Sequence, residues 1–273
     1  MKMKRLVSVI LAGMMSTVLL ASCGKTNLTN ADLTVLDESL ADELYGIATA
    51  KDNTALRDMI QIGLDKAIED GTAAEIATKW FGSDTIYKPE SKTFEPDPNA
   101  TYDKDTIVLG CDVNFAPMGF KDGDEVVGFD IDLAKAVIED EMGKKLQIQP
   151  ITWSNKEAEL AAGKVDVLWN GLTINDERLA AMSFTEAYMQ NAQAIIVPKD
   201  SDIKSSADLE GKKVAMQKAS TAVEAYEASG INAETVELAD NVACLNELKT
   251  GRVDAVIMDL VVANYYLAMD DAE

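Results

Sequence analysis

A seven-residue pattern that occurs twice constrains the fold of this chain more than any other feature. Residues 162–168 read AGKVDVL and residues 250–256 read TGRVDAV. Each copy follows a helix-like run, opens an apolar strand-like run and leads to polar residues, among them Asn170 in one case and Asp259 in the other. Ligands of open α/β sheets bind beyond the carboxyl ends of the strands. The repeat therefore predicts two similar halves that hold one small ligand between them.

The order of helix-like and strand-like runs is the same in both halves. In the first half the patterns predict strands at 106–109, 146–151 and 165–169, and helices at 129–142 and 155–162. In the second half they predict strands at 213–216, 234–238 and 253–258, and helices at 221–228 and 241–249. Gly143 and Gly230 each end the first helix of a half. Such alternation indicates an α/β fold with parallel sheets and right-handed crossovers.

Three segments lie outside these halves. Residues 191–198 form a β-rich run between them, and we expect one strand to cross from lobe to lobe there. Residues 53–69 and 72–81 read as amphipathic helices that precede the first half. Residues 83–104 carry three of the six prolines in a polar stretch without periodicity, which predicts a surface linker.

Charge and composition exclude several classes of function. The chain has 273 residues, enough for two domains, with 47 acidic and 25 basic side chains, so we expect no binding to nucleic acid. The surplus acid is typical of a soluble exported protein. Histidine is absent, which removes the usual general base and the commonest metal ligand. We therefore expect neither a metal site nor a cofactor.

The N-terminal segment has the layout of an export signal. Five residues that include three basic side chains precede an apolar run from 6 to 21, which predicts a signal peptide over 1–22. The run ends at Leu20-Ala21-Ser22-Cys23, which resembles a bacterial lipobox with Cys23 as the lipidated residue. An uncleaved anchor with a chance cysteine is the alternative. Cys111 and Cys244 fall in different predicted lobes, so we expect two buried, unpaired thiols.

Several segments together resemble the extracellular solute-binding proteins of polar amino-acid ABC transporters, solute-binding protein family 3. They are FAPMGF at 115–120, GFDIDLA at 128–134, WNGLT at 169–173 with Arg178, QKAST at 217–221 and DAVIMD at 254–259. The resemblance implies a two-lobed, type II periplasmic-binding-protein-like fold with the ligand in the interlobe cleft. It also implies a monomer that binds one free amino acid outside the cytoplasm and delivers it to a membrane permease.

The order of the segments differs from that of the family. Residues 35–48 and 70–82 resemble the final third of such a protein, yet here they come first. This predicts a circular permutation, which surface termini tolerate; a misassembled gene and a truncated fusion are the alternatives. Lobe 1 would then span 45–192, including the 83–104 linker. Lobe 2 would span 193–273 plus 33–44 and would lie closest to the membrane.

A free amino acid requires a cation for its carboxylate and an anion or carbonyl groups for its ammonium. Arg178 suits the carboxylate because a guanidinium forms two parallel hydrogen bonds, and Asn175 is placed to cap its helix. Ser220 and Thr221 begin a predicted helix, where free N–H groups favour an anion. Position in the sequence alone does not exclude simpler roles. Arg178 could be a solvated surface arginine, and Ser220, Thr221 and Asp259 could be helix caps.

The resemblance implies the remaining roles. Asp259 would bind the ligand ammonium together with the Gly171 carbonyl and the Thr173 hydroxyl. Phe115 would cover the ligand side chain, and the rest of the cleft would be lined by Asp112, Asn114 and Asn170. Trp153 and Trp169 are predicted to be packing residues at the margin of the cleft. Ala219 stands where the family usually has glycine.

Two other functions fit the same fold. A dehydratase of cyclic acids needs a proton-transferring group in the cleft, and Asp112 or Asp259 is available for that role. A sensory module would present the bound amino acid to a receptor kinase. Because the chain has neither a kinase nor a second apolar membrane segment, we expect a transport component without enzymatic activity.

Overall fold

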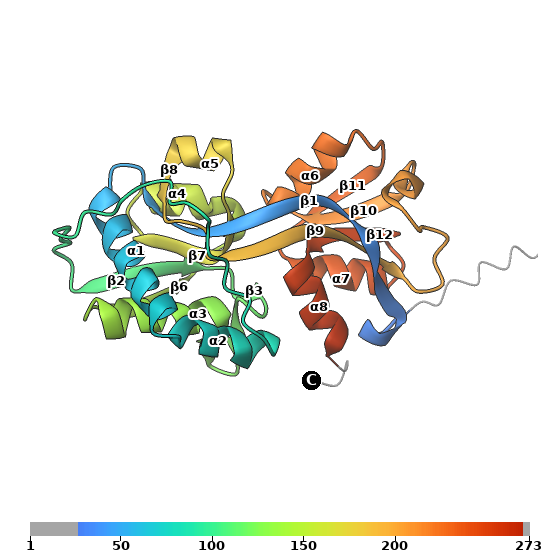
Figure 1. Ribbon diagram of the computed structural model, residues 1–273. Coiled ribbons are helices and arrows are strands. Elements are labelled where there is room, and N and C mark those ends of the chain that lie inside the picture. The colour runs from blue at the N-terminus through green and yellow to red at the C-terminus, as the bar shows by residue number, and fades with distance from the viewer. Residues whose placement is uncertain (1–26, 270–273) are drawn as a thin grey trace, which may run out of the picture.

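Two lobes joined by two long strands make up the structure (Figure 1). The computed structural model describes residues 27–269, so the predicted signal peptide and Cys23 lie outside the described residues. Lobe 1 contains helices α1 to α5 and lobe 2 contains α6 to α8. The joining strands are β1 (Leu33–Ala50) and β9 (Met189–Pro198). In the described part of the chain, no helix is both long and apolar enough to cross a membrane.

One nine-stranded sheet runs through both lobes in the order β11-β10-β12-β9-β1-β7-β2-β6, with β8 paired to β1. Lobe 1 contributes β2 (Thr106–Cys111), β6 (Lys145–Pro150), β7 (Val167–Thr173) and β8 (Met182–Phe184). Lobe 2 contributes β10 (Lys213–Gln217), β11 (Glu234–Leu238) and β12 (Ala255–Asp259). The pairs β2–β6, β2–β7, β10–β11 and β10–β12 are parallel, which confirms the predicted α/β class. A small sheet of β3 (Asn114–Phe115), β4 (Gly119–Asp122) and β5 (Glu125–Val127) was not predicted.

The helices follow the predicted pattern closely. Lobe 1 has α1 (Thr54–Glu69), α2 (Thr72–Phe81), α3 (Phe129–Lys135), a π-helical continuation η2 (Ala136–Glu141), the 3₁₀ turn η3 (Trp153–Asn155), α4 (Lys156–Ala161) and α5 (Asp176–Ala181). Lobe 2 has η1 (Asn30–Asp32), η4 (Ser206–Leu209), α6 (Thr221–Ser229), α7 (Asn241–Lys249) and α8 (Leu260–Ala268). Gly143 and Gly230 have φ of 64° and 69°, the left-handed conformation expected where a helix ends.

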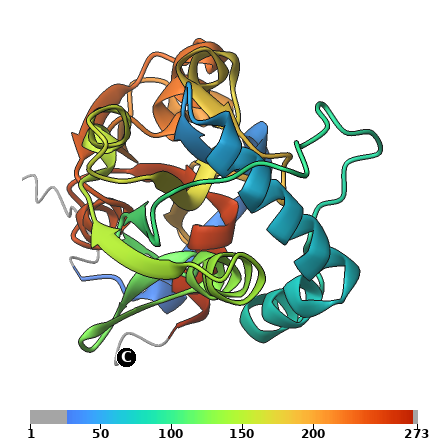
Figure 2. The same ribbon diagram turned by 90° about the vertical axis from the view of Figure 1, so that its left-hand side faces the viewer.

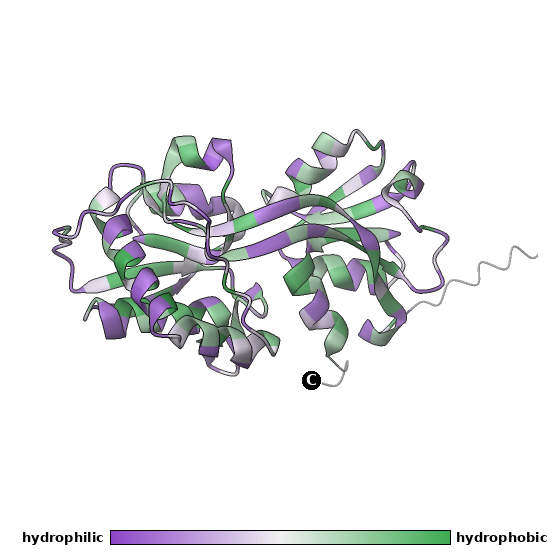
Figure 3. Cartoon of the chain, in the orientation of Figure 1, coloured by the Kyte–Doolittle hydropathy of each residue, from purple (hydrophilic) through white to green (hydrophobic). Residues whose placement is uncertain are grey.

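Strand β1 departs most from the sequence-based expectation. Residues 33–44 were assigned to lobe 2 and residue 45 to the start of lobe 1, whereas β1 is one strand of 18 residues that enters both lobes (Figure 1). Residues 33–45 pair with β9, and residues 45–50 pair with β7 and β8. Figure 3 shows that the middle of β1 and of β9 is hydrophilic where the strands cross between the lobes. The polar crossing interrupts the apolar pattern, and for this reason the sequence does not reveal one continuous strand.

The linker at 83–104 contains no helix and no named strand, but it is attached to lobe 1. Ile86 forms an isolated bridge with Met189. The buried carboxylate of Glu186 accepts hydrogen bonds from the backbone N–H groups of Thr93 and Phe94. Figure 2 shows the segment passing over the outside of lobe 1 between α2 and β2. The segment therefore runs along lobe 1 without regular secondary structure.

The two cysteines within the described residues are free and buried, as predicted. Burial raises the pKa of both thiols, in the case of Cys244 to about 12. Neither thiol is therefore a nucleophile at neutral pH.

Candidate ligand site between the lobes

Arg178 is a buried cation. The Asn175 side chain accepts a hydrogen bond from the backbone N–H of Arg178 at 2.8 Å, which confirms the predicted cap of α5. The guanidinium donates to the Thr173 carbonyl at 2.9 Å, and only 5% of the residue is exposed. None of the ion pairs found among residues 27–269 includes Arg178. Because an isolated buried charge is costly, this position is suited to an anionic ligand group.

The two lobes meet next to Arg178. The Thr173 hydroxyl at the end of β7 lies 3.3 Å from the Thr221 hydroxyl at the start of α6. The Ser220 hydroxyl donates to the Gln217 carbonyl at 2.8 Å and does not cap α6. The capping explanation therefore does not account for the Ser220 side chain.

Asp259 is at the start of α8, yet its carboxylate makes no capping hydrogen bond. Instead it accepts from the Tyr45 hydroxyl at 2.6 Å and from the Asn191 side chain at 2.9 Å. The Asn191 side-chain oxygen accepts from the Val261 N–H at 3.2 Å and so caps the helix in its place. Burial, and then the negative charge of Glu43, raise the pKa of Asp259.

Glu43 connects the two ends of the site. Its Oε2 accepts from the side-chain amides of Asn191 and Gln193, each at 3.0 Å. The same Gln193 amide donates to the Thr221 hydroxyl at 3.3 Å. A continuous chain of polar contacts therefore runs from Arg178 in lobe 1, through Thr221 and the crossing strands, to Asp259 in lobe 2.

The sequence analysis did not identify the residues of the crossing strands. Glu43 and Tyr45 on β1, and Asn191 and Gln193 on β9, each stand two positions apart and so face the same side of their strand. Polar residues at alternate positions of a crossing strand are the signal that would have found them.

Asp112 forms a second polar group across the cleft. It accepts from the Gln217 side chain at 2.6 Å and from the Asn114 N–H at 3.0 Å, and its own N–H donates to the Asn170 side chain at 2.8 Å. The Asn114 side chain donates to Asp240 in lobe 2 at 3.2 Å. Burial raises the pKa of Asp112. The predicted residues Asp112, Asn114 and Asn170 thus lie together.

Aromatic rings border the cleft on the lobe 1 side. Phe115 and Trp153 are nearly parallel, with ring centroids 6.4 Å apart and an interplanar angle of 7°. Gly171 has φ of 58°, and a Cβ there would lie 2.7 Å from the Phe115 ring, so glycine is required. The Gly171 N–H donates to buried Asp130 at 2.7 Å. Trp169 is fully buried against Tyr188, and Trp153 belongs to a buried apolar cluster, so both have the predicted packing role.

Lys156 is a second buried cation that the sequence did not single out. Its ammonium donates to the Ala219 carbonyl in lobe 2 at 2.9 Å and lies 4.9 Å from the centre of the Trp153 ring. Burial, and then the positive charge of Arg178, lower its pKa. Lys156 therefore faces the loop between β10 and α6.

Ala219 has φ of 57°, the left-handed conformation that favours glycine. We expect Ala219→Gly to stabilise the fold by about 0.5 to 1 kcal/mol, because the relief of strain exceeds the entropic cost of glycine. Thermal unfolding should show a Tm higher by about 2 to 4 °C. Ala222→Gly in helix α6 is the matched control and should lower the Tm. A lower Tm for Ala219→Gly would contradict this account.

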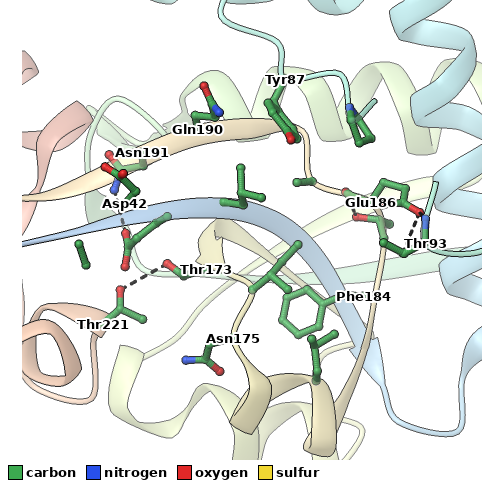
Figure 4. Close-up of a pocket in the computed structure, with 18 of the residues that line it drawn as sticks. Asp42, Tyr87, Thr93, Thr173, Asn175, Phe184, Glu186, Gln190, Asn191 and Thr221 are labelled. Carbon is green, nitrogen blue, oxygen red and sulfur yellow. Dashed lines mark hydrogen bonds between the residues drawn. The ribbon is translucent and has the colours of Figure 1, made fainter. Parts of the chain in front are cut away.

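A cavity of about 1260 Å³ opens beside Thr173 and Thr221. Figure 4 shows that the linker, the two crossing strands and the region around α5 and α6 all contribute to its wall. Five of its lining side chains are acidic and none is basic; the acidic ones are Asp42, Glu43, Glu90, Glu186 and Glu224. Among the described residues, no group of three or more His, Cys, Asp or Glu side chains is arranged to hold a metal ion.

Comparison with known proteins shows which family this chain resembles. Residues 107–234 match the sequence model of the bacterial extracellular solute-binding proteins, family 3. The chain is 31% identical to the arginine-binding extracellular protein of Bacillus subtilis over 173 residues, covering 62% of this chain and 68% of that protein. It is 32% identical to the glutamine-binding ABC transporter protein of Bacillus subtilis over 165 residues, covering 59% of this chain and 60% of that protein.

Solved structures give the same result. An ABC uptake transporter substrate-binding protein from Streptococcus pneumoniae with bound histidine is 39% identical, with a TM-score of 0.58 over 60% of this chain and 69% of that one. An ancestral amino-acid-binding protein described as a precursor of cyclohexadienyl dehydratase is 37% identical, with a TM-score of 0.57 over 59% and 73% of the two chains. These similarities confirm the predicted two-lobed α/β fold.

Proposed function

The chain belongs to the bacterial extracellular solute-binding proteins of family 3, and from that premise we propose that it is the substrate-binding component of an amino-acid ABC importer. As a monomer it closes its lobes around one free amino acid and presents it to a membrane permease. Arg178 binds the ligand carboxylate, with Ser220 and Thr221 at the helix start beside it. Asp259 binds the ammonium, together with the Gly171 carbonyl and the Thr173 hydroxyl.

The observation that carries this proposal is the polar chain between the two lobes. Within residues 27–269, it places a buried guanidinium without an anionic partner at one end and a buried carboxylate without a cationic partner at the other. A zwitterion supplies both missing charges. Closure excludes water and strengthens these contacts.

A thermal-shift screen of the full chain against the common amino acids tests the proposal. A ligand at 100 times its dissociation constant adds about 2.7 kcal/mol of stability, which appears as a higher Tm. If no amino acid changes the Tm, and none binds by calorimetry, the proposed function is wrong.

We also propose that the chain is circularly permuted relative to its family, with lobe 1 at 45–192 and lobe 2 at 193–273 plus 33–44. In support, α1 and α2 complete lobe 1 although they precede β2 in the sequence. The two ends of the described chain lie together on lobe 2, where the Asn30 side chain donates to the Met269 carbonyl at 3.4 Å. The match to the arginine-binding relative covers one segment of 173 residues. A permuted chain is expected to match in this way, because a sequential alignment cannot include the segment that has changed its place.

Restoring the family order tests the permutation. A variant that joins residue 269 to residue 30 through about four Gly and Ser residues, and opens the chain between residues 91 and 92, should fold and bind the same amino acid with similar affinity. Circular dichroism and calorimetry measure both properties. A rearranged chain that folds but no longer binds would contradict the proposal.

The extracytoplasmic location would depend on Cys23 as a lipidated residue after removal of 1–22, with lobe 2 closest to the membrane. Metabolic labelling with a radioactive fatty acid should mark the wild-type protein and not Cys23→Ala. Labelling of both would overturn the assignment of Cys23.

We propose no chemistry on the ligand, but a cyclic-acid dehydratase is the second candidate because one structural neighbour is described as a precursor of such an enzyme. The raised pKa of buried Asp259 supports it as a proton-transferring group. Incubation with bound compounds followed by NMR distinguishes the two, since a binding protein returns its ligand unchanged. A sensory module would instead be identified by capture of a receptor kinase.

A further inference from the structure

Four aromatic rings form a continuous row that crosses from lobe 1 to lobe 2. The rings of this aromatic row belong to Trp80 on α2, Phe120 on β4, and Tyr265 and Tyr266 on α8. Trp80 and Phe120 meet edge to face, with ring centroids 5.9 Å apart and an interplanar angle of 85°. Phe120 and Tyr265 are 5.6 Å apart across the lobe boundary, and Tyr265 and Tyr266 are also 5.6 Å apart. Each spacing lies in the range in which aromatic pairs attract each other.

Tyr266 connects the aromatic row to the short strand that carries two predicted cleft residues. Its hydroxyl donates to the Asn114 carbonyl at 3.3 Å, across the boundary between α8 and β3 that Figure 1 shows. Burial raises the pKa of Tyr266 to about 12, so the hydroxyl is a neutral donor at neutral pH. Phe115 directly follows Asn114 on β3. A strand of lobe 1 that borders the cleft is therefore held in place by a helix of lobe 2.

A polar contact reinforces the same boundary. The Asn114 side chain donates to Asp240 at 3.2 Å, and Asp240 is also the N-cap of α7 in lobe 2. Helix α8 is firmly attached to lobe 2, where its residue Val262 is fully buried. These contacts include neither Arg178 nor Asp259, the two groups proposed to hold the ligand. The lobes are thus joined by contacts between their own side chains that do not pass through the ligand.

We propose that the aromatic row is a latch that holds the lobes closed independently of the ligand, with Phe120 and Tyr265 as positioning residues for binding. When only the closed form binds tightly, the apparent dissociation constant is the intrinsic one divided by the closed fraction. A weaker latch lowers that fraction and weakens the binding of every amino acid by the same factor. This effect on affinity rests on the proposed function, whereas the effect on lobe opening does not.

Small-angle X-ray scattering of the full chain, dialysed free of amino acids, measures lobe opening directly. Tyr265→Ala and Phe120→Ala remove the same contact from opposite lobes, and each should give a larger radius of gyration than the wild type. Asn264→Ala is the matched control, because Asn264 is an exposed residue of α8, and it should scatter as the wild type does. Unchanged radii in both latch variants would overturn the inference.

Calorimetry with L-arginine, L-glutamine and L-histidine measures the effect on affinity. Tyr265→Ala and Phe120→Ala should each weaken the binding of every amino acid that the wild type binds by one common factor of about 3 to 10. The double variant should lose less than the product of the two single factors, because both substitutions remove one contact. Tyr266→Phe, which loses only the hydroxyl, should weaken binding by a smaller common factor. Losses that differ between amino acids would place the rings at the ligand and overturn the latch.

The outcomes separate this inference from the proposed function. If no amino acid binds to the wild type but Tyr265→Ala opens the lobes, the proposed function fails and the latch is supported. If amino acids bind and neither the radius nor the affinities change, the latch fails and the proposed function is supported. Circular dichroism shows whether each variant is folded. Because Phe120 and Tyr265 lie in different lobes, a folding defect in one variant leaves the other to decide.

Discussion

We expect the substitution Arg178→Ala to abolish amino-acid binding and to leave the fold intact. The guanidinium is the cation proposed for the ligand carboxylate, and truncation of one partner of a buried charge pair costs about 2 to 5 kcal/mol. Affinity should therefore fall roughly 30-fold to several thousand-fold. Without ligand, the variant should lose little stability, because among the described residues the buried guanidinium has a single hydrogen-bond partner, the Thr173 carbonyl.

Calorimetry and thermal unfolding measure the two effects separately. Arg252→Ala is the matched control, since Arg252 is an exposed lobe 2 arginine paired with Glu247 on the surface, and it should bind as the wild type does. Arg178→Lys should bind with intermediate affinity because it keeps the charge and loses the two parallel hydrogen bonds. Normal affinity in Arg178→Ala would show that another group binds the carboxylate.

The largest expected loss of stability comes from Gly128→Ala, at the start of α3. Gly128 has φ of 143°, and a Cβ there would overlap the Met118 carbonyl oxygen and lie 2.6 Å from the Met118 carbonyl carbon. That carbonyl cannot withdraw freely because it accepts the Asp130 N–H at 2.9 Å. We expect destabilisation on the order of 3 kcal/mol or more, measured by urea unfolding.

Gly123→Ala measures the cost of the backbone conformation without a steric overlap of the new Cβ. Gly123 has φ of 60° and nothing within 4 Å of the position of a Cβ, so substitution there brings only the conformational cost of about 1 to 2 kcal/mol. A similar loss in both variants would show that the contact with Met118 contributes nothing.

The regular part of the fold could be predicted because each element is encoded locally. The helices α1, α2 and α7 have clear periodicity and clear ends, and the repeated pattern placed β7 and β12. The extent of β1 could not be predicted in the same way. Its central residues are polar because the strand leaves one lobe and enters the other there, so its continuity depends on pairing with β9, far away in the sequence.

The residues of the candidate site differ in the same way in how far the sequence could predict them. Arg178, Thr173 and Asp259 stand at strand ends or helix starts, where a local pattern makes them candidates, and the family resemblance implied their roles. Glu43 and Lys156 acquire their roles only from burial against distant segments. Lys156 in particular stands in an ordinary charged helix start, and nothing in the sequence distinguishes it from a solvated lysine.

The pairing of β1 has a mechanical consequence. Residues 41–45 pair with β9 in an unbroken register, whereas register shifts occur on one side between Val35 and Ala41 and on the other between Gly46 and Ala48. Irregular pairing bends more easily than a regular ladder. In the closure proposed above, the backbone would bend at these register shifts, and the side chains of residues 41–45 would keep their spacing.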